Sequence, residues 1–121
     1  MTFAESDLAR LDQLEEIEVE TRSADGVVHR TIVWPVVRDG TVYLRSYKGP
    51  SGRWYREALA NPSVALHVEG RRLPASAEPA ADAASVEACS VALRDKYATS
   101  YSLKAMLVPD VLPTTLKLVP A

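Results

Sequence analysis

The pattern of apolar and polar side chains predicts a series of short strands. Strict alternation over Glu16–Thr21 and Ser63–Val68 is typical of half-buried strands. Two runs rich in β-branched residues, Val27–Val37 and Thr41–Tyr47, flank the turn residues Asp39-Gly40 and therefore predict a β-hairpin. Further strands are expected over residues 71–78 and 114–119.

Helical spacing appears in three places. Leu8, Leu11 and Leu14 share one face of an amphipathic helix over about residues 5–13, with Ser6 as its N-cap. A glycine-rich loop precedes a second helix over residues 53–60, which stops at Asn61-Pro62. A third helix begins after Asp82 as N-cap and continues to about residue 97. Its apolar stripe contains Val86, Cys89 or Ser90, Leu93 and Tyr97.

This order of elements favours an α+β fold. Consecutive strands joined by tight turns predict a mostly antiparallel sheet that curls into a small barrel with flanking helices. Pro35 lies inside a strand arm and has no amide proton for the ladder, so we expect a bulge or a sheet edge there. We expect one domain over residues 1–121, with the barrel over about residues 14–119.

Composition narrows the function classes. The chain has 121 residues, 47% apolar and 25% charged, with 14 basic and 16 acidic side chains and a formal charge of −2. No apolar run reaches the roughly 20 residues of a membrane span, and the amino terminus lacks a signal-peptide pattern, so we predict a cytoplasmic protein without membrane partners. One cysteine, Cys89, and two histidines predict neither a disulfide nor a metal site. The near-balanced charge argues against a nucleic-acid partner.

Basic and aromatic residues gather between the hairpin and the second helix. Arg45, Lys48, Arg53 and Arg56 are interleaved with Tyr43, Tyr47, Trp54 and Tyr55. Glycine amides before a helix start, together with the helix dipole and nearby cations, favour an anion such as a phosphate, with flat aromatic faces beside it. The alternative interpretation is an ordinary loop with solvated cations, because the segment matches neither a P-loop nor a dinucleotide fingerprint.

Three stretches carry a family resemblance. Residues 30–49, the pair Trp54-Tyr55, and the run 58–71 with its Leu-Ala-Asn-Pro and Gly-Arg pieces resemble a short branch of the flavin/deazaflavin-dependent, nitroreductase-like reductases. These belong to the FMN-binding, pyridoxamine-phosphate-oxidase-like split β-barrel superfamily. The resemblance implies a split-barrel homodimer that binds FMN or the deazaflavin coenzyme F-420 and passes a hydride to a small organic substrate.

Matching positions give the expected cofactor-binding residues. Arg30 matches a basic residue that reaches the cofactor phosphate or tail, Lys48-Gly49 match a lysine-glycine pair, and Trp54 matches a tryptophan beside the cofactor. Combining this resemblance with the basic loop, we expect cofactor contacts at Arg30, Thr31, Ile32, Val33, Arg45, Ser46, Tyr47, Lys48, Gly49, Ser51, Gly52, Arg53 and Trp54. Deazaflavin-binding members carry a Gly-Arg-Lys-Ser-Gly stretch before the position of Arg30. Here only Arg22 and Ser23 remain of it, which leaves FMN and F-420 both open.

Flavin chemistry requires few catalytic side chains, because the cofactor ring carries the hydride. Tyr47 or Tyr55 would serve as proton donor, and His67 is a further candidate, although the pattern favours a packed helix position for Tyr55 and a surface or dimer-interface position for His67. Trp34 and Cys89 are expected in the core. The main alternative function is a non-catalytic carrier or sensor of a flavin, heme or other planar anion. A single-stranded nucleic-acid binder is disfavoured by the net charge.

Overall fold

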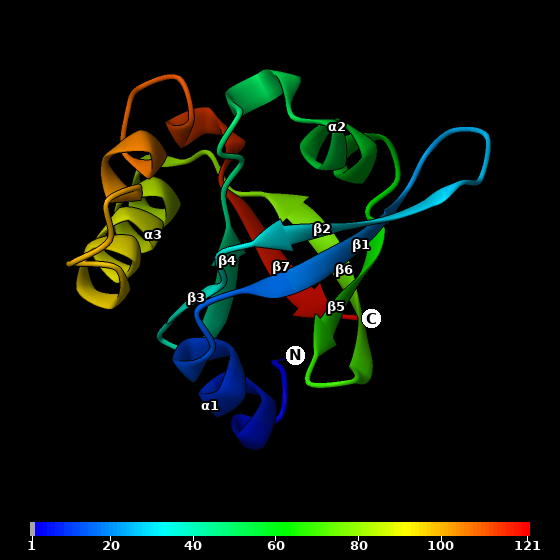
Figure 1. Cartoon of the computed structure of the whole chain (residues 1–121), viewed down its shortest axis with the longest axis horizontal. Coiled ribbons are helices and arrows are strands. Elements are labelled where there is room, and N and C mark those ends of the chain that lie inside the picture. The colour runs from blue at the N-terminus through cyan, green and yellow to red at the C-terminus, as the bar shows by residue number, and fades with distance from the viewer. Residues whose placement is uncertain (1) are drawn as a thin grey trace.

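The computed structural model describes residues 2–121, in which a seven-stranded sheet is accompanied by three α-helices (Figure 1). The helices are α1 (Glu5–Gln13), α2 (Arg53–Ala60) and α3 (Ala83–Lys96). The strands are β1 (Ile17–Arg22), β2 (Val28–Val33), β3 (Val36–Arg38), β4 (Thr41–Leu44), β5 (Ser63–Val68), β6 (Arg71–Pro79) and β7 (Leu116–Pro120). Three short 3-10 helices are η1 (Gly49–Ser51), η2 (Leu103–Met106) and η3 (Leu112–Thr114).

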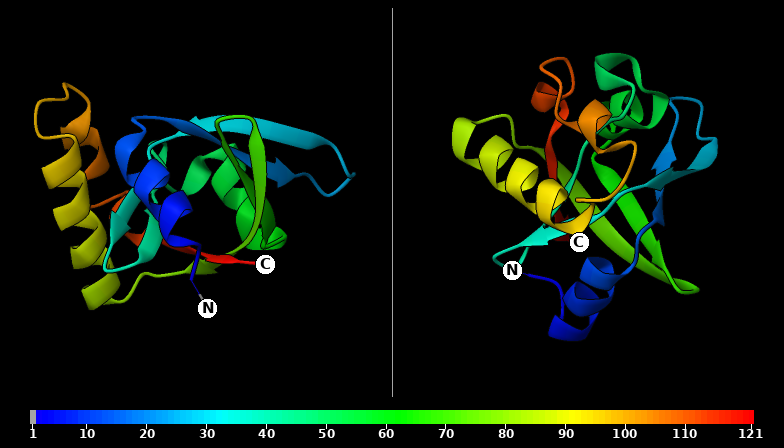
Figure 2. Two further views of the ribbon diagram at one scale, coloured as in Figure 1. Left: turned by 90° about the horizontal axis from the view of Figure 1, so that it is seen from below. Right: turned by 60° about the vertical axis from the view of Figure 1, so that its left-hand side comes forward.

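The sheet has the order β2-β1-β5-β6-β7-β4-β3, and every neighbouring pair is antiparallel. It curls around a core, with α2 over one end and α1 near the other (Figures 1 and 2). Side chains from both helices, including Leu11, Trp54 and Ala58, complete the buried cluster inside the curl. Burying a leucine or valine of this kind stabilises the fold by about 1.5–3 kcal/mol. The expected α+β antiparallel split barrel is confirmed.

Local signals set most helix boundaries. The Asp82 carboxylate caps α3 by accepting a hydrogen bond from the Ser85 amide at 3.0 Å, as the sequence predicts. Most of the α3 stripe is buried, with Cys89 fully inaccessible, whereas Val86 in the first turn is half-buried. The predicted cap of α1 was wrong by two residues, because Ala4 occupies the N-cap position and Ser6 already lies inside the helix. No side chain caps α1, which is stabilised instead by its apolar contacts with the barrel.

The predicted hairpin is confirmed only next to its turn, and the outer half of its first arm pairs elsewhere. Asp39 and Gly40 both have positive φ, 51° and 78°, and connect β3 to β4, with Val36 opposite Tyr43. The arm breaks at Trp34-Pro35, where the missing proline amide ends the ladder. The preceding half, β2, pairs with β1 at the other end of the strand order. One predicted strand therefore supplies both outer edges of the sheet.

The strand β7 joins the two parts of the sheet, because it pairs with β6 on one side and with β4 on the other. On the outer side of β3 and β4 a second apolar cluster packs against α3. The segment after α3, including η2, lies beside that helix on the same side of the barrel (Figure 2, right). None of the helices within residues 2–121 has the length and apolar character needed to cross a membrane.

Candidate functional site

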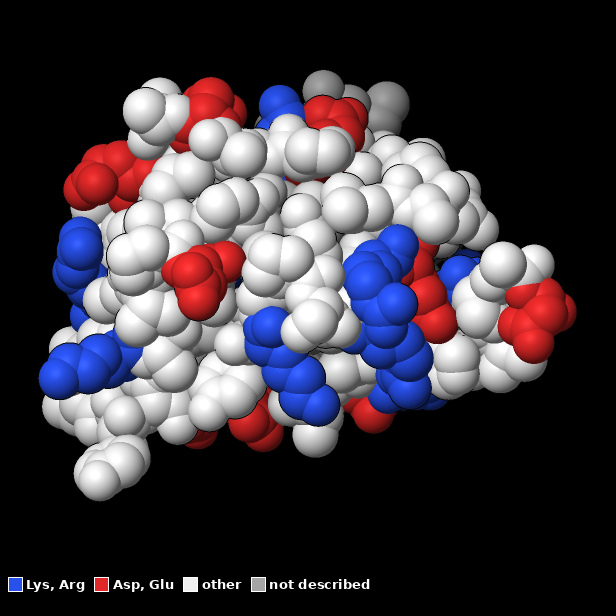
Figure 3. All heavy atoms as spheres, turned by 90° about the horizontal axis from the view of Figure 1, so that it is seen from above, with Lys and Arg blue, Asp and Glu red and all other residues white. Residues whose placement is uncertain are grey.

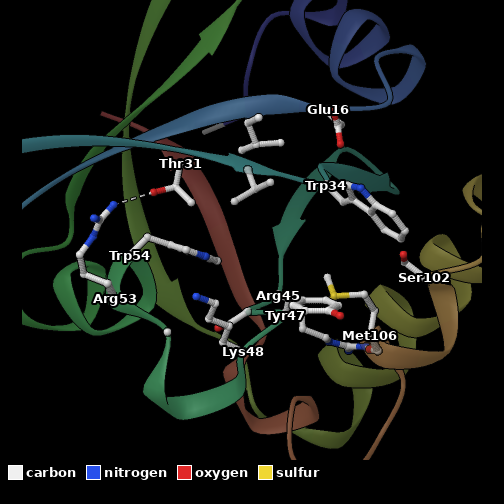
Figure 4. Close-up of a pocket in the computed structure, with 14 residues that line it drawn as sticks. Glu16, Thr31, Trp34, Arg45, Tyr47, Lys48, Arg53, Trp54, Ser102 and Met106 are labelled. Carbon is white, nitrogen blue, oxygen red and sulfur yellow. Dashed lines mark hydrogen bonds between the residues drawn. The ribbon is translucent and has the colours of Figure 1, made fainter.

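A cavity of about 510 Å³ opens between the edge strand β2, the end of β4, the start of α2 and η2 (Figure 4). Its size falls in the range of small-molecule sites. Because β2 is the terminal strand of the sheet and pairs only with β1, its free edge presents a row of unpaired backbone groups. The cavity is lined by Glu16, Thr31, Ile32, Val33, Trp34, Arg45, Ser46, Tyr47, Lys48, Gly52, Arg53, Trp54, Ser102 and Met106.

Arg45 follows β4 and forms part of the cavity wall, but its guanidinium also links distant parts of the chain. The side chain is buried and donates four hydrogen bonds of 3.0–3.1 Å. The acceptors are Thr115 Oγ1, Ser90 Oγ, and the backbone carbonyls of Met106 and Val86. Arg45 thus connects β4 with α3 and η2 and fixes one wall of the cavity.

No carboxylate within residues 2–121 lies within ion-pair distance of Arg45. Burial lowers the pKa of its guanidinium, although an arginine retains its charge in proteins. Three basic side chains, Arg45, Lys48 and Arg53, line the cavity beside a single acidic one, Glu16. On the face seen from above α2 and η1, basic side chains stand out across the middle (Figure 3). The cavity therefore favours an anionic ligand.

The loop between β4 and α2 is held by its own hydrogen bonds. The Gly49 amide donates to the Ser46 carbonyl, and the Gly52 amide to the Gly49 carbonyl. The expectation that these two glycine amides point at a ligand was therefore wrong. Their role is steric: Gly49 has φ +69°, and a Cβ on Gly52 would lie 2.5 Å from Ser46 Oγ. The loop is rigid because Ser46 is buried and bound to Thr114 through its amide.

Helix α2 begins at the cavity wall. The amides of its first turn have no acceptor within the helix, and the N-cap, Gly52, offers no side chain to cap them. Arg53 projects along the cavity and donates to Thr31 Oγ1 at 3.1 Å, which connects α2 to the β2 edge (Figure 4). Lys48 is exposed at the same end, and its ammonium forms no ion pair within the described residues. This end of the cavity combines two cations with the amides of a helix start.

Glu57 lies on α2 one turn after Arg53 and interacts with the Arg53 side chain. Its carboxylate accepts from Thr21 Oγ1 at 2.7 Å, faces His29 Nδ1 at 3.0 Å and lies 3.9 Å from the Arg53 guanidinium. Burial raises the pKa of Glu57, but the hydrogen bonds from Thr21 and His29 outweigh that effect and lower it. The ionised carboxylate therefore orients Arg53.

The opposite end of the cavity is aromatic. Trp34 stacks on the buried Tyr97, with 4.0 Å between ring centroids and 11° between the planes. The cavity here is also lined by Tyr47, Met106, Ser102 and Glu16 (Figure 4). Glu16, Ser102 and Met106 were not expected in a site, and Trp34 was expected in the core. A breaker residue such as Pro35 directly after a tryptophan was the one available signal that Trp34 leaves the ladder.

The structure brings together all of the expected cofactor-binding residues except Arg30, Gly49 and Ser51. Arg30 lies on the outer face of the sheet, where its guanidinium is 2.7 Å from the Glu18 carboxylate. Ser51 is exposed, and its hydroxyl donates to the Lys48 carbonyl. Gly49 shapes the loop from a buried position.

The candidate proton donors separate in space. Tyr47 lies at the cavity with 61% of its surface exposed, whereas Tyr55 packs against the main core. The His67 Nε2 atom is 2.8 Å from the Glu20 carboxylate, and His67 does not line the cavity.

Burial raises the pKa of the Cys89 thiol to about 11, which makes it unreactive. Among residues 2–121, no group of three His, Cys, Asp or Glu side chains is arranged to hold a metal ion.

The curled antiparallel sheet with its lateral cavity is the split-barrel fold of the pyridoxamine-phosphate-oxidase type. A protein named for pyridoxamine 5′-phosphate oxidase from Listeria innocua superimposes with a TM-score of 0.69 at 19% identity, covering 95% of this chain and 90% of its own. The sequence belongs to the DUF2255 family, described as an uncharacterized protein conserved in bacteria, which it matches over residues 7–118. No functionally curated protein matches it.

Two further similar structures differ in what their names say they bind. An F-420-H2-dependent reductase has a TM-score of 0.63 at 16% identity, covering 86% of this chain and 93% of its own. The heme storage protein HutZ from Vibrio cholerae has a TM-score of 0.68 at 13% identity, covering 100% of this chain and 92% of its own. At these identities the similarity establishes the fold.

Proposed function

We propose that the chain binds a phosphate-bearing flavin or deazaflavin, FMN or coenzyme F-420, in the cavity beside β2. We further propose that it acts as a reductase that transfers a hydride between this cofactor and a small organic acceptor. The observation that carries the proposal is the cavity itself, in which cations and free helix amides occupy one end and flat aromatic walls the other.

The side chains present suit such a cofactor. An anionic phosphate would satisfy Lys48, Arg53 and the first amides of α2, which have the same electrostatic sign. Arg45 adds a buried positive charge behind this wall, but its donors are largely committed to the protein. A planar ring would lie against the Trp54 and Trp34 side chains, which both line the cavity. The unpaired backbone groups on the edge of β2 would form hydrogen bonds with the polar atoms of that ring.

A bound flavin or deazaflavin would supply the hydride chemistry. The chain would orient the cofactor and set the electrostatic field around its ring. Lys48 and Arg53 bind the charged tail, and Glu57 orients Arg53. The β2 edge orients the ring through backbone groups. Tyr47, at the opening, is the candidate to hold a proton for the acceptor.

Uptake of cofactor by the purified protein tests the proposal. We expect FMN or F-420 to bind at concentrations on the order of tens of micromolar, measured by fluorescence and equilibrium dialysis. Lys48→Ala and Arg53→Ala should each weaken binding about tenfold, because each removes a charge-assisted phosphate contact. Added salt should weaken binding by the wild type more than binding by either variant.

Arg56→Ala is the matched control, because Arg56 is an exposed cation of the same helix that does not line the cavity. Its affinity should equal that of the wild type. No uptake of either cofactor would contradict the proposal. Equal weakening by Arg56→Ala and Lys48→Ala would show that the phosphate does not lie in this cavity.

A carrier or sensor of another planar anion is the second candidate. It is supported by the shared fold of a heme storage protein and by the excess of cations over acids in the cavity, which suits carboxylate-bearing rings equally well. The visible absorption spectrum of protein purified from its native host separates flavin, deazaflavin and heme. Binding without oxidation or reduction of the cofactor in the presence of acceptors would favour the carrier.

We also propose a homodimer, because the cavity opens at the surface and a chain of this size has little apolar area to close it alone. A second copy would narrow the opening. Size-exclusion chromatography with light scattering should give a mass near twice 13.2 kDa. A mass of one chain at micromolar concentration would contradict the dimer.

A further inference from the structure

Arg45 carries a buried positive charge that the protein itself does not neutralise. Its side chain is 3% exposed, and no carboxylate within residues 2–121 lies within ion-pair distance of it. Its hydrogen bonds all go to neutral acceptors, two hydroxyl groups and two backbone carbonyls. A buried charge without a counter-charge is unfavourable, so this guanidinium favours a negative charge in its surroundings.

The ionisable groups around Arg45 do not supply that negative charge. On α3, burial raises the pKa of the Cys89 thiol to about 11, so the thiol is neutral near pH 7, and Arg94 is itself a cation. Lys104 of η2 is also cationic. Glu16 is the one acid among the described residues that line the cavity beside β2, and water screens its exposed carboxylate. The charge of Arg45 is therefore left for a ligand to neutralise.

The guanidinium lies at the aromatic end of the cavity. It donates to the carbonyl of Met106, which lines that end together with Tyr47 and Trp34 (Figure 4). Trp34 is stacked on the buried Tyr97, with 4.0 Å between the ring centroids, and so offers a fixed flat surface to another ring. A planar ring at this end would lie close to a buried cation whose field water screens little.

We propose that the aromatic end of the cavity selects a planar ring in its anionic form, such as a phenolate, an enolate or a deprotonated ring amide. The negative charge of the ring neutralises Arg45, which the protein leaves without a counter-charge. This inference rests on the proposed function in one respect, because it names the class of ring that the same cavity holds. It applies to the ring of a cofactor and to that of an acceptor, and it requires no phosphate.

The probe is 7-hydroxycoumarin, a planar phenol without a phosphate, used in the absence of any cofactor. Absorbance separates its phenol from its phenolate, so a titration with excess protein from about pH 6 to 9 gives the pKa of the bound probe. We expect that pKa to lie about one unit below the pKa of the free probe, which is a tenfold preference for the phenolate. 7-Methoxycoumarin, which cannot ionise, is the matched ligand, and its affinity should stay constant over the same pH range.

Substitutions assign the effect to the charge of Arg45. Arg45→Lys retains the positive charge and should retain the shift in the pKa of the probe, whereas the uncharged Arg45→Met should abolish it. Glu16→Gln removes the opposing charge from an exposed position and should strengthen the phenolate preference about twofold. Glu15→Gln is the control, because Glu15 is an exposed neighbour that does not line the cavity, and its result should equal that of the wild type.

A bound probe with the pKa of the free probe would overturn the proposal, as would no binding of either coumarin at about 1 mM. A shift that persists in folded Arg45→Met, or that disappears in Lys48→Ala, would place the phenolate beside another cation and would also overturn it. If Arg45→Met does not fold, Glu16→Gln decides, because an unchanged pKa there would place the ring outside this end.

The proposed function and this inference fail separately. Uptake of FMN or F-420 without a shift in the pKa of 7-hydroxycoumarin would support the proposed function and overturn the selection of an anionic ring. A shift without uptake of either cofactor would contradict the proposed function and support that selection.

Discussion

Replacing Glu20 with glutamine should remove most of one acid-sensitive contribution to stability. Glu20 lies on β1 with its side chain only 12% exposed, 2.9 Å from the Arg72 guanidinium and 2.8 Å from His67 Nε2. Hydrogen bonding to Arg72 is the main cause that lowers the pKa of Glu20 from 4.5 to about 2, against the opposing effect of burial and with help from His67. The native state therefore holds this carboxylate ionised more strongly than the unfolded chain does.

The magnitude follows from proton linkage. A fall from 4.5 to about 2 corresponds to about 3 kcal/mol of unfolding free energy at most. Because the Arg72 side chain is 51% exposed and solvent screens the pair, we expect about 1–2 kcal/mol. This contribution is complete above pH 4.5 and disappears as the pH falls towards 2.

Urea denaturation monitored by tryptophan fluorescence, at several pH values from 7 to 2, measures the effect. The free energy of unfolding of the wild type should fall by about 1–2 kcal/mol more than that of Glu20→Gln over the acid range. Glu18→Gln is the matched control, since Glu18 lies on the same strand as Glu20 and its pair with Arg30 of β2 is 41% and 49% exposed, so it should contribute below about 0.5 kcal/mol. Identical pH profiles for wild type and Glu20→Gln would refute the reasoning.

Three other substitutions or measurements test the packing around the cavity. Arg45→Lys should lower the free energy of unfolding by about 1–3 kcal/mol in urea denaturation, because one ammonium cannot reach four separate acceptors; a loss below about 0.5 kcal/mol would contradict this. Gly52→Ala should cost about 1–3 kcal/mol through the clash with Ser46 Oγ, and adding Ser46→Ala should recover part of that loss; strictly additive losses would exclude the clash. Cys89 should react with a thiol reagent only as fast as the protein unfolds, and rapid labelling of the native state would show that α3 opens locally.

The parts of the fold that depend on near neighbours were predictable. Alternating side chains identified β1 and β5, the Asp39-Gly40 pair identified the hairpin turn, and Asp82 marked the start of α3. Each signal acts within a few residues, so its physical cause is already present in the local sequence. In the structure the glycine-rich loop before α2 contributes Lys48 and Gly52 to the cavity wall.

Pairing partners and burial were not predictable in the same way. The residues on either side of Pro35 have similar β-forming character, so nothing local shows that β2 leaves the predicted hairpin and pairs with β1. Arg45 looks like a ligand-binding cation in the sequence, and only the packing of α3 and η2 around it reveals its hydrogen bonds within the protein. Met106 reaches the cavity from a segment without periodicity, far along the chain from the end of β4 at Leu44, so no short window of sequence contains that contact.

The connection between the two parts of the sheet depends on the strand β7. The four strands β2, β1, β5 and β6 and the hairpin of β3 and β4 are hydrogen bonded to one another only through β7 within the described sheet. The two walls of the cavity are therefore far apart in the strand order, because β2 is its first strand and β4 is next to its last. A ligand that contacts both walls would bridge the opening between β2 and β4 and close the curled sheet, as an additional strand would. It should raise the force needed to peel β7 away, and fraying of β7 should release the ligand before the helices unfold.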